Sequence, residues 1–207
     1  MSFRRILFVI ILTCLGNFAY SQVNETDTIK KQEPQLKIKK AGGIFISPIL
    51  GAEFPIKDLN NNSKYAFCFG GRLEYSSLSI YPFVIAATIQ YQNHGGADDF
   101  KTIYLINKLN TKITSFGMSV DVLLNKYLKS SFTIPFVFLE ARSFSVKREV
   151  SPEANFPNLK STDNIIGFGG GVGFTLYIFD IYTTYMSAKD YSTISIKTRF
   201  RFPLLKF

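Results

Sequence analysis

The chain has 207 residues, a length that suits one domain and leaves little room for a second. Its aromatic residues are 21 Phe and 11 Tyr with no Trp, and together with 14 Gly they favour β-strands over helices. The formal net charge is +9, but the basic residues are scattered and no helix-turn-helix or zinc pattern accompanies them. This argues against a nucleic-acid partner.

The first 21 residues have the parts of a secretory signal peptide. Two arginines precede an apolar run over residues 6–12, and residues 19–21, Ala-Tyr-Ser, form a small-x-small cleavage site. The run is far shorter than the roughly 20 residues that a spanning helix needs. We therefore predict a signal peptide over residues 1–21, a flexible periplasmic lead-in over 22–41 and a β-barrel over 42–207. Loss of the two arginines lowers the net charge from +9 to +7. Removal of residues 1–21 also leaves a single cysteine, which is too few for a disulfide.

Eight segments follow residue 42, most of them with the length that a tilted transmembrane strand requires. Apolar and polar residues alternate in most of them. The predicted strands cover residues 43–54, 65–76, 81–91, 115–124, 132–146, 166–176, 179–187 and 192–202. Long connections at about 55–64, 93–111 and 147–163 alternate with short ones, including a tight turn at 179–180. The predicted fold is all-β, an eight-stranded antiparallel up-and-down transmembrane β-barrel.

The last predicted strand, over residues 192–202, indicates which face meets lipid. One face carries Ile194, Ile196 and Phe200, and the other carries three cations. Three cations cannot pack in an apolar core. In a membrane barrel, lipid takes the apolar face and a polar lumen takes the charges. Pro203 follows, and we expect it to end the strand.

A soluble lipocalin-like carrier also has eight strands and a signal peptide, but its apolar faces point inward. Eight strands enclose room only for side chains or one small ligand, too little for the many Phe, Ile, Leu and Tyr residues of this chain. In addition, Tyr65 and Tyr75 bracket the second strand, and Tyr81 and Tyr91 bracket the third. Each pair spans roughly 33 Å of strand, or roughly 25 Å along the membrane normal, which is the height of the apolar band between aromatic girdles.

Three stretches carry a resemblance to a known family. They are the Ala-Tyr-Ser junction before Gln22, the glycine-rich sixth strand IIGFGGGVGF over residues 165–174, and the closing segment ISIKTRFRF. From Gly43 to Phe202 the chain resembles the small eight-stranded outer-membrane barrels. These are the OmpA-like and OmpX-like group, in particular the porin-family or PorT-like barrels of Bacteroidota. The resemblance implies an outer-membrane location, contacts with lipid and the barrel-assembly machinery, and a barrier, adhesion or accessory role without catalytic residues.

The inward faces of the predicted strands carry nearly balanced acids and bases. Because an eight-stranded lumen is narrow, we predict that they form a salt-bridged network that closes it. The predicted members are Glu53, Arg72, Glu74, Asp121, Glu140, Arg142, Lys197, Arg199 and Arg201. In the sixth strand, the alternate glycines are expected to leave space for bulky lumen side chains from neighbouring strands.

No catalytic or cofactor motif stands out, and we predict no enzyme activity, no cofactor and no metal. The glycine-rich strand lacks the spacing of a phosphate-binding loop. His94, the single histidine, is expected to lie in a plain surface loop rather than to act as the base of an acyl hydrolase.

The second outer loop contains the apolar run Ile103, Tyr104, Leu105 and Ile106, a candidate contact patch for a surface or envelope protein partner. We therefore expect a barrel with a closed lumen that acts through its outer loops in surface interaction, envelope integrity or as a secretion accessory. The alternatives are a narrow solute pore, an outer-membrane lipid-modifying hydrolase and the soluble carrier.

Overall fold

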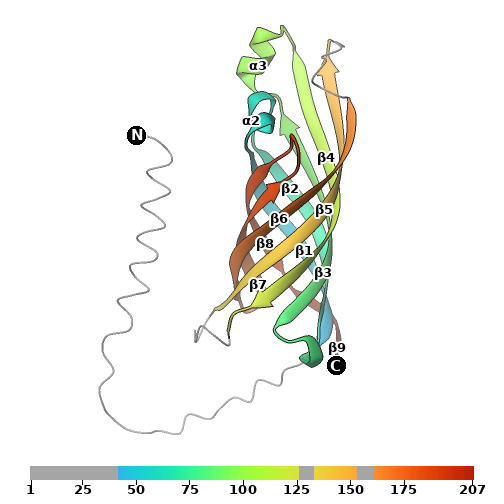
Figure 1. Cartoon of the computed structure of the whole chain (residues 1–207), viewed down its shortest axis with the longest axis vertical. Helices are drawn as coiled ribbons and strands as arrows, with labels where there is room; N and C mark the ends of the chain where they lie inside the picture. The colour runs from blue at the N-terminus through green and yellow to red at the C-terminus, as the bar shows by residue number, and fades with distance from the viewer. Residues whose placement is uncertain (1–41, 126–132, 153–160) are drawn as a thin grey trace, which may run out of the picture. The chain divides into compact units, whose positions relative to one another are not determined.

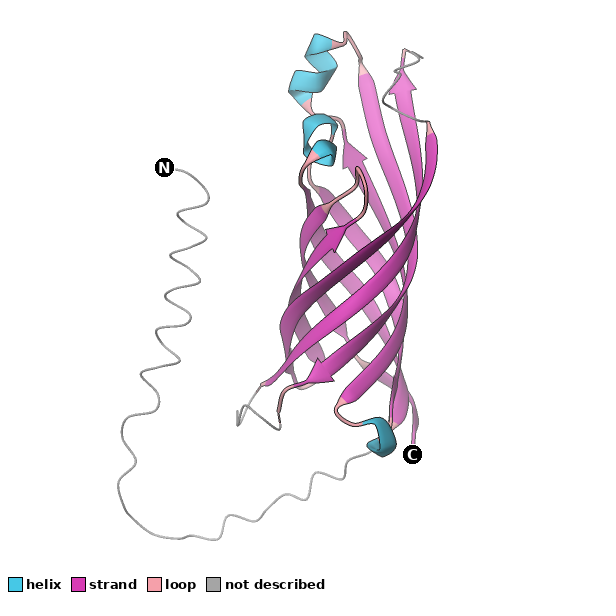
Figure 2. Ribbon diagram, viewed as in Figure 1, coloured by secondary structure: helices cyan, strands magenta, loops and turns pink. Residues whose placement is uncertain are grey.

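The computed structural model describes residues 42–125, 133–152 and 161–207. The predicted signal peptide (1–21) and lead-in (22–41) lie outside these residues. The strands are β1 Gly43–Pro55, β2 Ala66–Ser76, β3 Phe83–Gly95, β4 Lys108–Leu123, β5 Ile134–Ser151, β6 Thr162–Leu176, β7 Phe179–Ser187, β8 Thr193–Phe200 and β9 Phe202–Lys206. The helical segments are α2 Asp58–Asn62, the 3-10 turn η1 Leu78–Ile80 and α3 Asp98–Ile103 (Figure 2). None of the described helices is long and apolar enough to cross a membrane.

The strands close into one barrel. Each strand from β1 to β8 pairs antiparallel with its neighbour in the sequence, and β1 pairs with both β2 and β8 (Figure 1). After Arg201, β9 continues the line of β8 and pairs with the first residues of β1. Together β8 and β9 therefore make the eighth strand of the wall, and the predicted eight-stranded antiparallel barrel is confirmed. The expectation that Pro203 ends this strand was wrong, because Pro203 lies within β9, opposite Phe45.

Two of the outer connections are shorter than predicted because the strands continue past the aromatic girdle. The connection predicted over residues 93–111 shrinks to 96–107, since both of its ends are paired strand. The connection predicted over 147–163 shrinks to 152–161 in the same way, and its residues 153–160 lie outside the described part of the chain.

The polarity of the inner and outer faces of the wall is reversed toward the outer ends of the strands. Over most of the barrel height, the large exposed side chains are apolar: Leu50, Phe69, Ile89, Phe116, Leu139 and Phe168. Toward the outer ends of β4 and β5 most of the buried, inward-facing side chains are apolar instead, with Thr111 as a polar exception; the apolar ones are Leu109, Ile113, Phe144 and Val146. Their exposed neighbours there are polar: Lys108, Ser145, Lys147 and Glu149. An apolar outer face suits lipid, and a polar outer face over an apolar interior suits water. The outer ends of β4 and β5 therefore project beyond the membrane, and the apolar belt below them does not fit a soluble carrier.

Aromatic rings from β5 and β7 fill the lower lumen beside the glycine-rich β6. Phe136, Phe138 and Tyr182 form a buried cluster there. A Cβ atom on Gly171 would lie 2.6 Å from Cζ of Phe138, and one on Gly173 would lie 2.7 Å from Cζ of Phe136. The predicted reason for these glycines, space for bulky lumen side chains, is confirmed at both positions.

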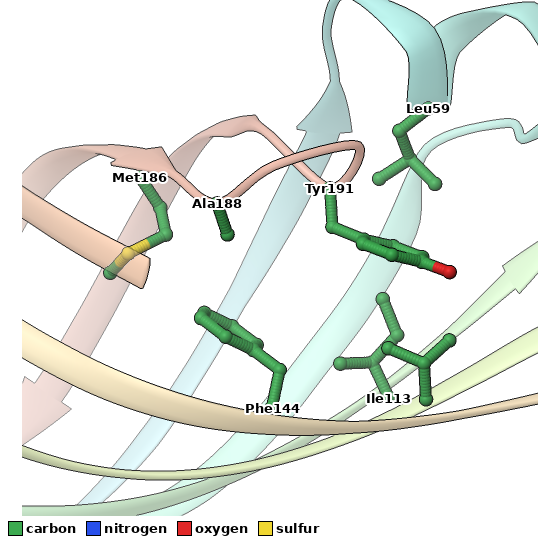
Figure 3. Close-up of a cluster of buried hydrophobic side chains, with 7 residues drawn as sticks. Leu59, Ile113, Phe144, Met186, Ala188 and Tyr191 are labelled. Atoms are coloured by element: carbon green, nitrogen blue, oxygen red, sulfur yellow. The ribbon is translucent and has the colours of Figure 1, made fainter. Parts of the chain in front are cut away.

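A second apolar cluster fills the outer end of the lumen. Figure 3 shows Leu59 of α2 pointing toward Tyr191 of the β7–β8 connection, with Ile113 and Phe144 below them. The buried members are Leu59, Ile113, Phe144, Val146, Met186, Ala188 and Tyr191. The connection between β1 and β2 thus folds back over the barrel and places an apolar side chain in its mouth.

Candidate functional site

Six charged side chains fill the lumen near the end that carries the short turns. We call them the lower ion network: Arg72, Glu74, Asp121, Asp180, Arg199 and Arg201. They come from β2, β4, β7, β8 and the residue between β8 and β9. All are buried except Arg201, whose side chain is 17% exposed. Three acids therefore face three bases in a space with little access to water.

Arg199 is the centre of this network. Its Nη2 donates to Oδ2 of Asp121 at 3.0 Å, and its Nε donates to the carboxylate of Asp180. The guanidinium carbon also lies 5.0 Å from the ring centre of Phe136 and 5.2 Å from that of Tyr182. A buried guanidinium is tolerated when anions and aromatic faces replace its hydration, and this site provides both.

The remaining contacts tie the two acids of β2 and β4 to further arginines. Nη2 of Arg72 donates to Oδ2 of Asp121 at 2.6 Å, and Nε of Arg72 lies 3.2 Å from Oε1 of Glu74. Nε of Arg201 lies 3.0 Å from Oε2 of Glu74. Nη2 of Arg201 also lies 3.1 Å from Oδ2 of Asp180, so each carboxylate is shared between two or more cations, and removing one partner leaves a buried charge unbalanced.

A second set, the upper ion network, lies nearer the outer end. Its members are Glu53, Gln90, Glu140, Arg142 and Lys197, from β1, β3, β5 and β8. Gln90 joins its two halves, since its Nε2 donates to Glu53 at 2.7 Å and its Oε1 accepts from Lys197 at 3.1 Å and from Arg142. Nζ of Lys197 lies 2.7 Å from Glu53, and Nη2 of Arg142 donates to Glu140 at 2.6 Å. Two acids again face two bases.

The structure places all nine predicted lumen residues on the inner face, distributed over these two networks. A tenth, Asp180, was missed because the turn had been expected at residues 179–180. The turn consists of Tyr177 and Ile178, since Leu176 pairs with Phe179, and Asp180 therefore belongs to β7 and points inward. With Asp180 the described networks hold five acids and five bases. The arginine-rich inner face of β8 could have signalled a missing acid on its neighbour β7.

Sequence reasoning placed His94 in a surface loop, and this was wrong. His94 lies on β3 and is fully buried. Its Nδ1 lies 2.9 Å from the Lys64 carbonyl oxygen and its Nε2 lies 3.1 Å from Oε1 of Gln92. Both ring nitrogens are thus occupied by structural contacts. Among the residues that the structure describes, no group of three or more His, Cys, Asp or Glu is placed to hold a metal ion.

The candidate contact run lies at the end of α3, and its four residues do not share one environment. Ile103, Tyr104 and Leu105 are 73%, 50% and 83% exposed, whereas Ile106 is only 5% exposed. The run predicted as a contact patch is therefore a three-residue exposed tip, with Ile106 as its buried anchor.

Asp98 attaches α3 to the barrel. Its carboxylate pairs with Lys101 at 2.8 Å and with Lys64, which precedes β2, at 2.6 Å. Hydrogen bonds from Lys101 and Lys64 lower the pKa of Asp98 from 3.8 to about 2. The side chain is exposed, so salt screens this attraction.

The polarity of the inner and outer faces of the wall indicates that the barrel lies in a membrane. Its wall is apolar on the outside over the height between the tyrosine girdles, and its lumen is charged, as lipid and a polar interior require. The chain is an outer-membrane β-barrel.

Solved outer-membrane barrels have a similar fold. Neisserial surface protein A is 15% identical, with a TM-score of 0.47 over 78% of this chain and 99% of that one. Ail of Yersinia pestis is 13% identical, with a TM-score of 0.43 over 78% and 98% of the two chains. The N-terminal barrel domain of Pseudomonas aeruginosa OprF is 10% identical, with a TM-score of 0.42 over 78% and 99%. No protein-family model and no curated protein matches the sequence.

Proposed function

We propose that this protein is a non-enzymatic outer-membrane barrel with a closed lumen, which acts through its outer loops in surface interaction, envelope integrity or as an accessory to secretion. The observation that carries the closed lumen is the Asp121–Arg199 contact, because it joins strands on opposite sides of the barrel. The upper ion network and the apolar cluster around Leu59 support it at two further heights.

Planar-bilayer recording of the refolded protein tests the closed lumen. We expect no steady single-channel conductance, because the side chains of both networks occupy the space that a water column would need. A large and steady conductance would refute the proposal and favour the narrow solute pore.

The absence of a catalytic role is supported by the position of His94. A serine hydrolase needs a histidine within hydrogen-bond reach of an accessible nucleophile. His94 is instead buried, with both ring nitrogens engaged by Lys64 and Gln92. An assay for release of acyl chains from outer-membrane lipid should show none above background.

The role of the loops is tested by replacing residues 97–106 with a short turn. The barrel should still assemble, because strand pairing continues up to residue 95 without the loop, whereas any surface contact should be lost. Contact with the barrel-assembly machinery and the narrower resemblance to porin-family or PorT-like barrels of Bacteroidota stay predictions.

A further inference from the structure

α3 ends in a Schellman motif whose left-handed residue is a leucine. Leu105 has a φ of 54°. Its N–H donates to the Thr102 carbonyl at 3.4 Å, and the N–H of Ile106 donates to the Lys101 carbonyl at 2.9 Å. Helices usually place Gly at this position, because a Cβ atom is disfavoured in the left-handed region.

This leucine is exposed rather than buried, so packing does not explain why it is there. It is the most exposed residue of the tip formed by Ile103, Tyr104 and Leu105. Ile106, the next residue, makes the buried contact that commonly accompanies the motif. A glycine at 105 would keep both hydrogen bonds without the strain. The exposed Tyr177 has a similar φ in the turn between β6 and β7, but of the two only Leu105 lies at the outer end of the barrel, and this position points to a role for its side chain.

Three contacts hold the tip on the barrel. The N–H of Ala97 donates to the Asn62 carbonyl at 3.0 Å, and the N–H of Asn107 donates to the Ser151 carbonyl at 2.9 Å. The Asp98–Lys64 ion pair adds a third link, here to the chain that precedes β2. A rigid tip loses little conformational entropy on binding.

The tip stands beyond the reach of its own bilayer's apolar core. Thr114 on β4 pairs with Tyr91, the girdle residue, and β4 continues outward for six residues to Lys108. At about 3.3 Å per residue and a tilt of about 40°, this places the base of the loop roughly 15 Å above the girdle. Figure 1 shows α3 at the end of the barrel opposite β9.

The backbone N–H groups of the tip are already hydrogen-bonded within the protein. The N–H groups of Tyr104, Leu105, Ile106 and Asn107 all donate to carbonyls of this chain. An unsatisfied donor is costly in lipid, and these four donors carry no such cost. Protein interfaces instead commonly rely on direct hydrogen bonds across the contact. Three adjacent apolar side chains whose backbone donors are already bonded can enter lipid, a partner that requires no directional hydrogen bonds.

The charges around the tip do not oppose this. Three lysines and two aspartates lie on or beside the loop: Lys64, Lys101, Lys108, Asp98 and Asp99. Their sum is +1, so an anionic headgroup layer does not repel the loop. Lysine stems also extend along apolar surface while the ammonium stays in water.

We infer that Ile103, Tyr104 and Leu105 form a wedge that inserts into the lipid surface of an apposed membrane, facing the outer side of the bilayer that holds the barrel. The inference rests on the proposed function of the outer loops and names a lipid surface as the partner that they contact. Leu105 lies at the apex and enters deepest.

The test uses the full mature chain in phosphatidylcholine nanodiscs, floated with vesicles of phosphatidylcholine and phosphatidylglycerol. The wild type should float with the vesicles, and empty nanodiscs should not. Leu105→Gly keeps the left-handed turn and should lower the partition by about tenfold, the effect of withdrawing one leucine from an apolar phase. Tyr177→Gly is the matched control. It removes another exposed side chain with positive φ, at the opposite end of the barrel, and should float like the wild type.

Equal flotation of the wild type and Leu105→Gly, or no flotation of either, would overturn the inference. If neither floats but trimming residues 97–106 still abolishes a surface contact, the proposed loop function stands and its partner is not a lipid surface. If trimming also changes nothing, both fail. Thermal unfolding of Leu105→Gly, expected at or above the wild-type temperature, verifies that any loss is not misfolding.

Discussion

Asp121 and Arg199 are joined by a 3.0 Å hydrogen bond between strands that face each other across the barrel. Asp121 lies on β4 and Arg199 on β8, and four steps separate these strands in either direction around the closed sheet. A direct contact between opposite walls spans the lumen at this height. The same pair also ties the two halves of the wall together, so the proposed closure of the lumen and the stability of the barrel depend on the same contact.

Replacing Arg199 with Ala should destabilise the barrel strongly. Asp121 and Asp180 would lose a shared buried cation, and breaking a buried pair costs about 3 to 5 kcal/mol. The chain has no tryptophan, so unfolding in denaturant is best followed by circular dichroism and by gel mobility without boiling. Lys108→Ala, which removes an exposed cation, is the control and should unfold like the wild type. Equal midpoints for the two variants would show that Arg199 does not stabilise the lumen.

Adding one methyl group in the lumen should also be costly. In Gly171→Ala the new Cβ would meet the Phe138 ring and the Thr183 backbone, an overpacking that costs about 1 to 3 kcal/mol. Gly71→Ala is a matched control, because its Cβ would meet nothing within 4 Å. The first variant should lower the free energy of unfolding and the second should change it little. A reversed order would contradict the inward packing of β6.

Leu59 should hold α2 over the outer end of the lumen without contributing much to the wall. We expect Leu59→Ala to release this connection, so that protease cuts within residues 56–65 sooner while strand content by circular dichroism is unchanged. Ile103→Ala, which truncates an exposed side chain, should leave the cleavage rate at these residues as in the wild type. If Leu59→Ala is cleaved no faster, the contact of Leu59 with the apolar cluster does not hold α2.

Acidification should loosen α3 at an unusually low pH. Since the folded state lowers the pKa of Asp98 below its ordinary 3.8, its ion pairs stabilise fully above that value and are lost as pH falls through about 2. Carboxyl NMR should give a midpoint for Asp98 near 2. Removing both cations in Lys64→Ala with Lys101→Ala should return it toward 3.8, and high salt should shift it the same way. A midpoint near 3.8 in the wild type would mean that Asp98 does not hold the helix.

The amino-acid sequence alone determined the barrel, the number of its strands and the membrane face of its wall. These follow from local alternation, because each lipid-facing strand must place its apolar residues on one side whatever its neighbours are. The same alternation predicts the inward position of Arg199, the tyrosine girdles and the glycines of β6 that leave space for lumen side chains.

Only the tertiary structure decided what the alternation does not encode. Beyond the tyrosine girdle the outer face of the wall meets water, and apolar residues such as Ile113 and Val146 face inward instead of outward. The sequence pattern of these strand ends therefore differs from that of a lipid-facing strand, and it predicted loops. The turn between β6 and β7 consists of residues 177 and 178, so Asp180 lies in paired strand and its side chain takes a position on the inner face. His94 is buried because β3 continues to Gly95 and places its side chain on the inner face, where it contacts Lys64 and Gln92. Pairing between opposite walls is a property of the closed barrel, and no local pattern along a single strand contains it.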